Sequence, residues 1–370
     1  MTSGATARLA LEGVRIFDAS QGVAGPYCGL LLAMNGAEVI KIEPPEGDWL
    51  RQLGDRVGDH SPHSWYLNRG KTSRVFDFKN PGQRREAIDL AAGCDVFLAS
   101  FRPGVVERLG LSYADLQARH PALVHCLISG YGQSGPRASR AAVDGVLQAF
   151  CGWADVNRTG GQPRVFPYFA VDMLAGMYAY QAVLQGLIRR WRFGEGARLE
   201  VSLMEAAAAF MGPRMLEIAL AHGVPPELFS PPNGVFQTRD GWFLVAVTSQ
   251  PQFALACQAL GCDGLAQDPR FASRALRGRN GEALTELFAQ RFTQLESADC
   301  ERRFEAQGAM GSTVLSPWQL LQDEQMAAAE AVLATETPEG DLAVVSIPGA
   351  SRDLQRQPAP ALGLHTQLDI

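Results

Sequence analysis

The stretch 162–177 brings one carboxylate, that of Asp172, to the start of an expected helix. The apolar periodicity of the following residues predicts this helix over about 173–191. One interpretation is structural, because an Asp directly before a helix is a favoured N-cap that accepts a first-turn N–H. The other is chemical. An ordinary Asp has a pKa near ~4, so at neutral pH it can attack an activated carbonyl, with the helix N-terminus favouring the negative charge.

The composition indicates an ordinary globular protein. At 370 residues with 46% hydrophobic content, the chain can bury a large core and is long enough for two domains. A net charge of -6 argues against nucleic acid as a partner, because neutralising phosphates needs a basic face. No basic leader and no apolar run of the ~20 residues that a membrane helix needs is evident. We therefore expect a cytoplasmic protein without a membrane partner.

The metal-binding residue types do not form a recognisable site. The seven cysteines are scattered and include no C-x-x-C pair, which is typical of reduced cytosolic proteins rather than of zinc sites or disulfide frameworks. His60 and His63 lie in a polar stretch without an accompanying Cys or an H-E-x-x-H helix. We therefore expect no metal site.

Residues 14–43 predict a βαβ unit. Residues 14–18 have the pattern of a strand, 21–29 form a glycine-containing turn into an apolar helix, and 37–43 have the pattern of a second strand. Such a unit predicts a parallel α/β sheet. Glu43 follows Gly22 at about the distance seen in dinucleotide-binding folds, but the glycine spacing is G-x-x-G-x-x-x-G rather than G-x-G-x-x-G. A nicotinamide cofactor is therefore not favoured.

Polar residues that could bind a ligand follow the predicted strands. The segment 51–108 holds ten basic and seven acidic residues, although the whole chain is acidic. Ligands of parallel α/β proteins bind at loops that follow the strands. The candidates in such loops are Arg51, Asn68, Lys71, Arg102 and Arg108.

The remaining pattern predicts the domain organisation. A strand over 123–129 is followed by a helix in which Asp144 is a second candidate cap, and then by long helices over 173–191 and 202–222. Proline-rich residues at 223–234 break this pattern before a strand pair over 234–238 and 241–247. We expect a large domain over 1–224, a small α+β domain over 225–320, and a return to the large domain over 321–370.

Several ordered blocks resemble the class III CoA-transferase family. Formyl-CoA transferase, the carnitine and bile-acid CoA-transferases and α-methylacyl-CoA racemase belong to this family. The blocks that carry the resemblance are residues 11–15, 24–26, 36–43, 68–71, 101–104, 129–136, 172–176, 268–272 and 359–363. They span almost the whole chain.

The resemblance implies a fold and a chemistry. The fold would be a large doubly wound parallel-sheet α/β domain built from both chain ends, a smaller α+β domain, and an interlocked homodimer. The Asp matching Asp172 would attack an acyl-CoA thioester to give a mixed anhydride, and CoA would then form an aspartyl-CoA thioester that a small carboxylic acid collects. Coenzyme A would be a substrate, and no permanently bound cofactor would be needed.

Matching positions imply a CoA-contacting set. That set comprises Val23, Ala24, Asn68, Lys71, Phe101, Arg102, Arg108 and Asp144, with Arg51 added from its place in a basic loop. Formyl-CoA transferase has a glutamine where Val23 stands and an arginine where Pro44 stands, which argues against a formyl or oxalyl substrate. The sequence does not identify the donor or the acceptor.

Two alternatives stay open. The racemase branch uses a histidine directly before the position of Asp144, where this chain has Val143, so two-base proton exchange lacks one partner and CoA transfer is favoured. The matching Asp serves racemases as a base, so Asp172 alone does not decide. The third interpretation is a non-catalytic CoA-binding relative, against which Asp172 itself argues.

Overall fold

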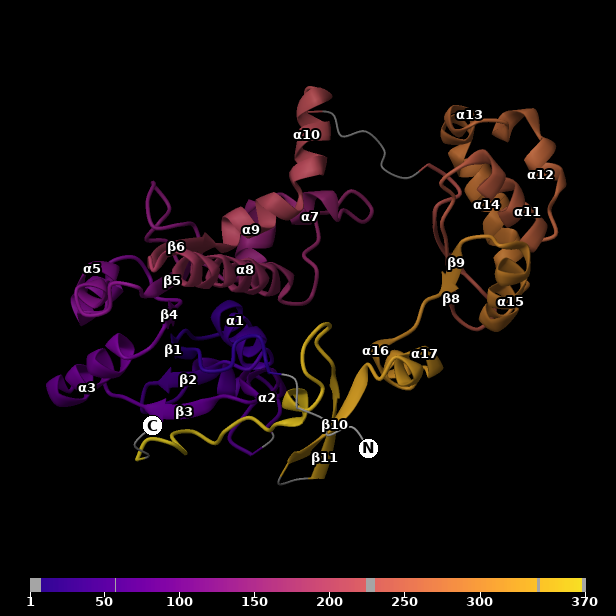
Figure 1. The fold of residues 1–370 in the computed structure, drawn as a ribbon. Helices are drawn as coiled ribbons and strands as arrows, with labels where there is room; N and C mark the ends of the chain where they lie inside the picture. The colour runs from indigo at the N-terminus through magenta and orange to yellow at the C-terminus, as the bar shows by residue number, and fades with distance from the viewer. Residues whose placement is uncertain (1–7, 57, 224–229, 338–339, 368–370) are drawn as a thin grey trace. The chain divides into compact units, whose positions relative to one another are not determined.

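The computed structural model describes residues 8–56, 58–223, 230–337 and 340–367 (Figure 1). The chain divides into two compact units, Met1–Pro213 with Ala328–Ile370, and Arg214–Ala327. The sequence-based boundaries for the small domain were 225 and 320, and part of the expected proline-rich linker lies outside the described residues. Within the described ranges, no helix is both long enough and apolar enough to span a bilayer.

A six-stranded parallel sheet forms the centre of the first unit, in the order β3-β2-β1-β4-β5-β6. Its strands are β1 (Arg15–Ala19), β2 (Glu38–Glu43), β3 (Thr72–Val75), β4 (Val96–Ala99), β5 (Val124–Ser129) and β6 (Ala197–Ser202). The predicted parallel α/β sheet is confirmed. The strand order reverses between β1 and β4, and ligands of such sheets bind beyond the carboxyl ends of the strands at this point.

Alternate residues of the strands build a core on each face of the sheet. Ile16 belongs to one core and its neighbour Phe17 to the other, because successive side chains of a strand point to opposite faces. The Ile16 core includes side chains of α1 (Ala24–Ala33), α6 (Asp144–Phe150), α8 (Ala170–Phe193) and α9 (Leu203–Phe210). The Phe17 core includes side chains of α3 (Pro81–Ala92), α4 (Val105–Leu109) and α5 (Tyr113–Gln117).

Helices α1 and α8 pack closely on one face (Figure 1). Gly176 makes this approach possible, since a Cβ atom there would lie 2.6 Å from the Ala24 carbonyl oxygen. The same packing places the first turn of α8 beside the loop that follows β1. The carboxylate of Asp172 is therefore positioned by the contact between these two helices.

Some elements differ from the sequence-based expectation. Strand β6 was not predicted, because only one of its six residues is fully buried and its hydrophobic pattern is weak. Strand β3 covers Thr72–Val75 rather than 75–78, where Asp77 accepts the N–H of Lys79 in a turn. The helix expected over 202–222 is divided into α9 and α10 (Gly212–Leu220). The short elements η1 (Trp49–Gln52), α2 (Pro62–Asn68) and α7 (Trp153–Val156) complete this part.

The second unit encloses an aromatic core against a three-stranded antiparallel sheet. Its strands are β7 (Gly234–Gln237), β8 (Trp242–Val245) and β9 (Gly311–Thr313). Its larger helices are α11 (Gln250–Ala259), α14 (Gly281–Phe292) and α15 (Ser297–Gln307). The shorter ones are α12 (Gly264–Gln267), η2 (Pro269–Phe271), α13 (Arg274–Arg279), α16 (Pro317–Leu321) and α17 (Glu324–Ala328).

The C-terminal residues of the first unit pack on its N-terminal part. They begin with an antiparallel hairpin of β10 (Val332–Thr337) and β11 (Gly340–Val345), followed by η3 (Leu354–Arg356). Gly70 then donates its N–H to the Pro358 carbonyl at 3.0 Å, and His365 donates to the Ser73 carbonyl at 3.0 Å. The segment therefore covers the edge of the sheet near β3.

Candidate active site

A cavity of about 910 Å³ lies at the carboxyl ends of the central strands. It is lined by residues that directly follow β1, β4 and β5, by the start of α6, and by the segment that leads into α8. Its position beside β1 and β4 coincides with the reversal of strand order in the sheet. The cavity is therefore where the topology predicts a ligand, and Asp172 is part of its lining.

Asp172 is the third residue of α8 and does not cap it. The N-cap is Phe169, whose side chain accepts no hydrogen bond, so the sequence-based interpretation of Asp172 as the cap is wrong. The carboxylate of Asp144 in α6 takes over this role. Its Oδ2 accepts the backbone N–H of Val171 at 2.7 Å and that of Asp172 at 3.0 Å.

The electrostatic environment of Asp172 is unusual. Burial, together with the charge of Asp144, raises the pKa of Asp172 to about 7. The expectation of an ordinary pKa near ~4 is therefore wrong. The helix N-terminus does not prevent this, because two of its free N–H groups are already bound by Asp144. The resulting carboxyl group is both more basic than usual and about half ionised at neutral pH.

The side chain of Gln148 in α6 forms hydrogen bonds with the segment that leads into α8. Its Nε2 donates to Asp144 Oδ1 at 2.5 Å and to the Phe166 carbonyl at 3.0 Å, while its Oε1 accepts the Phe166 N–H at 2.7 Å. Its side chain is almost fully buried. The segment carrying the cavity-lining rings of Phe166, Tyr168 and Phe169 is therefore held by the same residues that cap α8.

The structure brings five of the proposed CoA-contacting residues to this cavity and leaves four elsewhere. Those in its lining are Val23, Ala24, Phe101, Arg102 and Asp144. Val23 and Ala24 follow β1, whereas Phe101 and the exposed Arg102 follow β4. Arg108 is exposed on α4 and is not part of the lining.

The other three candidates belong to a buried polar network beneath the loop that follows β1. Lys71 Nζ lies 3.0 Å from Asp18 Oδ2, and it also donates to the Pro26 carbonyl at 2.9 Å and to Asn68 Oδ1 at 3.1 Å. All of these side chains are buried. Within this single chain Lys71 and Asn68 therefore hold the start of α1, and they do not face the cavity.

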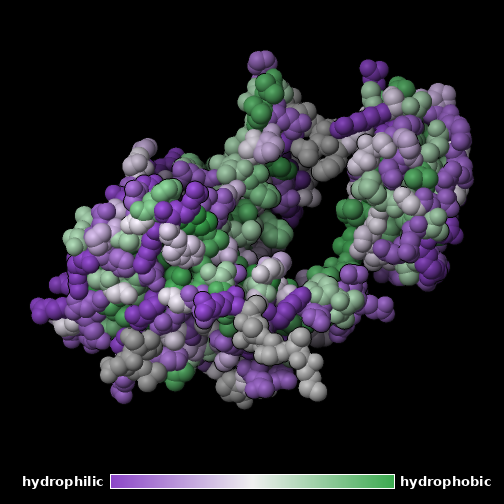
Figure 2. Space-filling model, viewed as in Figure 1, coloured by the Kyte–Doolittle hydropathy of each residue, from purple (hydrophilic) through white to green (hydrophobic). Residues whose placement is uncertain are grey.

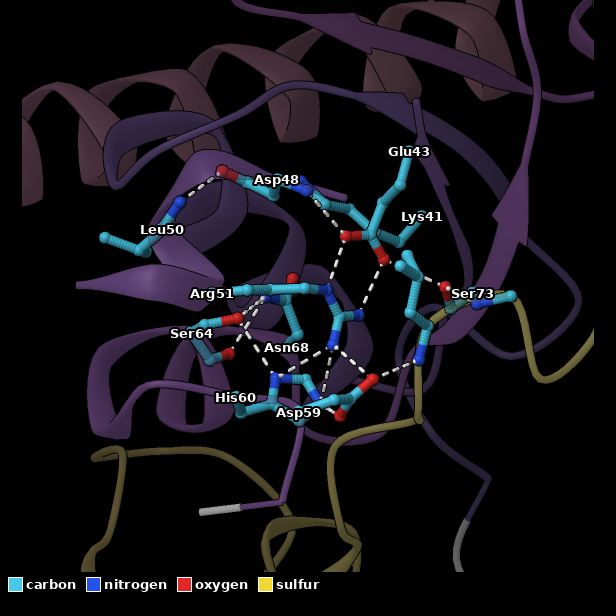
Figure 3. A network of polar contacts seen from close by, with 12 residues as sticks. Lys41, Glu43, Asp48, Leu50, Arg51, Asp59, His60, Ser64, Asn68 and Ser73 are labelled. Carbon is cyan, nitrogen blue, oxygen red and sulfur yellow. Dashed lines mark hydrogen bonds and ion pairs between the residues drawn. The ribbon is translucent and has the colours of Figure 1, made fainter. Parts of the chain in front are cut away.

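Arg51 has two carboxylate partners in the same region (Figure 3). Its Nε and Nη2 each lie 2.7 Å from an oxygen of Glu43, and its Nη1 lies 3.2 Å from Asp59. Burial alone would raise the pKa of Glu43, but hydrogen bonds from Arg51 and the charge of Lys41 lower it to about 2. The positive charge of Arg51 is therefore already neutralised by the protein.

Asp48 joins this network to the cavity wall. Its carboxylate accepts the N–H of Gly22 at 3.1 Å and that of Leu50 at 3.0 Å, and it pairs with Lys41 Nζ at 3.0 Å. Gly22 and Trp49 are both part of the cavity lining. The buried charges thus fix the loop after β1, which is an indirect contribution to the site.

Sequence reasoning missed several residues of the lining, among them Trp49, His63, Arg140 and Gln148. Trp49 and His63 lie in a region that looked like one long polar loop, and Arg140 has no motif around it. The only signal for Gln148 was its place one turn after Asp144. Among the described residues, no group of three His, Cys, Asp or Glu side chains is arranged to bind a metal.

Comparison with known proteins gives this cavity a family context. The model of the CoA-transferase family III matches residues 11–366, nearly the whole chain. The chain belongs to CoA-transferase family III. It is an enzyme of that family, as the class III CoA-transferase resemblance predicted.

Named relatives in this family act on several CoA thioesters and acids. The succinyl-CoA:glutarate CoA-transferase of Mus musculus is 30% identical over 96% of this chain and 85% of its own length. The acetyl-CoA:oxalate CoA-transferase of Acetobacter aceti is 33% identical over 74% of this chain and 72% of its own length. These family III members are similar to this chain along most of its length.

Solved structures share the whole fold. The crystal structure of Rv3272 from M. tuberculosis has a TM-score of 0.87 and 28% identity, over 98% of this chain and 99% of the other. A CAIB/BAIF family protein from Brucella suis also has a TM-score of 0.87 and 28% identity, over 97% of both chains. The arrangement described above is therefore a family III fold.

Proposed function

We propose that this protein is an acyl-CoA:carboxylate CoA-transferase in which Asp172 is the nucleophile. The observation that carries the proposal is a carboxyl group with a pKa of about 7 in the lining of the large cavity of a family III fold. Relatives of this family transfer CoA between acids such as succinate and glutarate or acetate and oxalate. For this chain the substrates would be an acyl-CoA donor and a small carboxylic acid.

The proposed reaction proceeds through covalent intermediates on Asp172. Its carboxylate attacks the thioester carbonyl, the C–S bond breaks, and a mixed anhydride and CoA thiolate form. The thiolate then attacks the aspartyl carbonyl, which releases the donor acid and leaves an aspartyl-CoA thioester. The acceptor carboxylate attacks this thioester to give a second anhydride. The released thiolate attacks the acceptor's acyl carbon, which forms the new acyl-CoA and frees Asp172.

The raised pKa of Asp172 suits this chemistry. A more basic carboxylate is a stronger nucleophile, while about half of the molecules still carry the required negative charge at pH 7. Asp144 contributes to the basicity through its charge and holds the start of α8 through its hydrogen bonds. Because acyl transfer between carboxylate and thiolate needs no redox step, we propose that no permanently bound cofactor takes part.

Arg102 and Arg140 are the candidates for contacts to the phosphates of CoA. Both are exposed, both line the cavity, and a guanidinium group suits bidentate contacts to phosphate. Phe101 beside Arg102 offers an aromatic face for the adenine. Arg51, Asn68, Lys71 and Arg108 remain proposals as CoA contacts, for which a rearrangement around the cavity would be needed.

The direct test is CoA transfer between a donor thioester and a labelled acid, with formation of the new thioester followed by chromatography. We expect Asp172→Asn to reduce transfer by at least about a thousandfold, the size of effect seen when a residue of the chemical step is removed. Asp155→Asn, the same change at an exposed site outside the cavity, should leave transfer unchanged. Full transfer by Asp172→Asn would contradict the proposal.

We also propose the interlocked homodimer and the cytoplasmic location. Support for a dimer comes from large hydrophobic side chains that α8 and α9 expose, namely Met177, Ile188, Trp191, Phe193 and Phe210. Figure 2 shows hydrophobic residues on the surface over α9. Seven free and buried cysteines fit a reducing compartment. Sedimentation of the purified protein should give twice the chain mass.

A racemase activity is the second candidate, and one observation favours it. Although Val143 stands where racemases have a histidine, the imidazole of His63 lines the same cavity as Asp172. Two bases on opposite sides of an α-carbon could exchange its proton. Incorporation of solvent deuterium into a 2-methylacyl-CoA, lost in both His63→Ala and Asp172→Asn, would support racemisation.

A further inference from the structure

We infer that the acyl subsite of this enzyme takes aromatic or similarly bulky apolar monocarboxylic acids rather than dicarboxylic acids. This inference rests on the proposed CoA transfer and specifies its substrate class. It is carried by an aromatic wall of the cavity, which we define as Trp49, His63, Phe166, Tyr168 and Phe169.

The aromatic wall presents large apolar surfaces to the open cavity. The exposed fraction is 51% for Trp49, 53% for Phe166 and 49% for Tyr168. The His63 ring lies edge-on to that of Phe169, with the centroids 5.3 Å apart, and Tyr168 lies 5.5 Å from Phe169. Exposed rings of this kind favour a flat apolar ligand, because burying aromatic surface is strongly stabilising.

The aromatic wall lies next to the nucleophile. Phe169 is the N-cap of α8 and precedes Asp172 by three positions. On the other side, the Trp49 ring covers Gly22, so that a Cβ atom there would meet it at 2.8 Å. Gly22 leads into Ala24, whose carbonyl contacts α8 at Gly176, one turn beyond Asp172. Asp172, Phe169 and Trp49 all line the same cavity, in which a group attached to a carbonyl at Asp172 would meet the wall.

Hydrogen bonds hold the backbone that carries the aromatic wall before any ligand binds. Both ends of the Gln148 amide fix the backbone at Phe166. The carboxylate of Asp48 caps η1 beside Trp49 and holds the N–H of Gly22. Because side-chain carboxylate and amide groups fix these segments, their backbone cannot move into the cavity without breaking these hydrogen bonds. This preorganisation lowers the entropy cost of binding a rigid apolar group.

The aromatic wall includes no arginine or lysine that could bind a second carboxylate. Among the described residues that line the cavity, the arginines are Arg102, after β4, and Arg140, in the segment after β5. Both are on the elements that we assign to the CoA phosphates. Arg51, which follows Trp49 closely in sequence, is buried and pairs with Glu43 and Asp59. A distal carboxylate against the wall would lose water without gaining an arginine or lysine partner, which is unfavourable.

A competition assay tests the inference. The acyl-CoA donor that supports transfer is offered equal concentrations of phenylacetate and succinate, and the ratio of the two new thioesters gives the ratio of their kcat/KM values. We expect at least about a tenfold preference for phenylacetate, within the range that a hydrophobic pocket provides. Trp49→Ala should reduce this preference about tenfold, because kcat/KM should fall more with phenylacetate than with acetate, which has no ring to place against the wall. Trp242→Ala, at a similarly exposed Trp in β8, is the matched control.

The outcomes separate this inference from the proposed function. A preference for succinate, glutarate or oxalate, with transfer still dependent on Asp172, would overturn the aromatic subsite while leaving CoA transfer intact. The same conclusion would follow if Trp49→Ala changed the rates with phenylacetate and acetate by the same factor. A second subunit that covered the wall would give this result. If no donor supported any transfer, the proposed function itself would fail.

Discussion

Asp144→Asn is the sharpest test of how the protein raises the pKa of Asp172. The substitution removes the neighbouring negative charge but keeps an oxygen that can accept the N–H groups of Val171 and Asp172. Gln148 loses its Asp144 partner and retains its bonds to the carbonyls of Phe166 and Tyr168. The start of α8 should therefore keep its position while the electrostatic effect disappears.

The expected change follows from Coulomb's law. The Oδ2 atom of Asp144 lies 3.0 Å from the Asp172 N–H nitrogen. Two unit charges about 5 Å apart repel by about 3 kcal/mol at an effective dielectric of about 20 and by about 1 kcal/mol in water. The charge of Asp144 is the smaller cause of the raised pKa, after burial. Because Asp172 is also partly exposed, water weakens the repulsion between the two carboxylates. We therefore expect the substitution to lower the pKa of Asp172 by about one unit, where one unit is about 1.4 kcal/mol.

The assay is the rate at which the donor acid is released in a single turnover without acceptor, measured from pH 5 to pH 9. The wild-type rate should rise with a midpoint near pH 7, because only the ionised carboxyl attacks the thioester. The midpoint of Asp144→Asn should lie near pH 6, so at pH 6 about five times more of the enzyme is ionised. Asp155→Asn is the matched control and should keep the wild-type midpoint. An unchanged or higher midpoint in Asp144→Asn would refute the assigned role of Asp144.

Three further predictions concern stability. Lys71→Met leaves the fully buried Asp18 charge without its ion-pair partner, so urea denaturation should show that the free energy of unfolding falls by about 3–5 kcal/mol. Lys79→Met, at an exposed lysine, should have little effect, and equal effects of the two substitutions would contradict the buried network. Gly176→Ala places a methyl group against the Ala24 carbonyl and should destabilise the protein by about 1–3 kcal/mol. Gly145 has open space around it, so Gly145→Ala should not destabilise the protein. If both substitutions were neutral, the close packing of α1 and α8 would be contradicted. The raised pKa of Asp172 means that the folded state binds more protons than the unfolded state between about pH 4 and pH 7, so this group makes the protein less stable as pH rises through that window. From pH 5 to pH 8, the free energy of unfolding of wild type should therefore fall by about 2–3 kcal/mol relative to that of Asp172→Asn. A difference in unfolding free energy that stayed constant with pH would show that the pKa of Asp172 is not raised.

The regular part of the fold could be predicted because local pattern and tertiary environment agree. Strands β1 and β2 are almost fully buried, so their apolar runs stand out, and the glycine turn between them marks the start of α1. Strand β6 was missed because its half-exposed edge carries Arg198 and Glu200 among its apolar residues. An edge strand of this kind depends on its neighbour for identification.

The sequence predicted the candidate site only in part, because some of its contacts join residues far apart in the chain. The position of Asp172 at a helix start was readable from the sequence, but its cap comes from Asp144, and no local pattern reveals a partner so far along the chain. Likewise, the basic character of Arg51 and Lys71 was visible, whereas their pairing with Glu43 and Asp18 depends on the assembled sheet. The sequence shows that Arg51 and Lys71 are positively charged, but it does not show which carboxylates neutralise them.

The central claim is that Asp172 forms a covalent intermediate, and intact-protein mass spectrometry tests it most directly. Wild type and Asp172→Ala are incubated with acetyl-CoA, succinyl-CoA and phenylacetyl-CoA, each followed by hydroxylamine. We predict an adduct on wild type that hydroxylamine removes, that peptide mapping assigns to Asp172, and that the variant lacks with every donor. An identical adduct on Asp172→Ala, or none on wild type with a donor that supports transfer, would contradict the account.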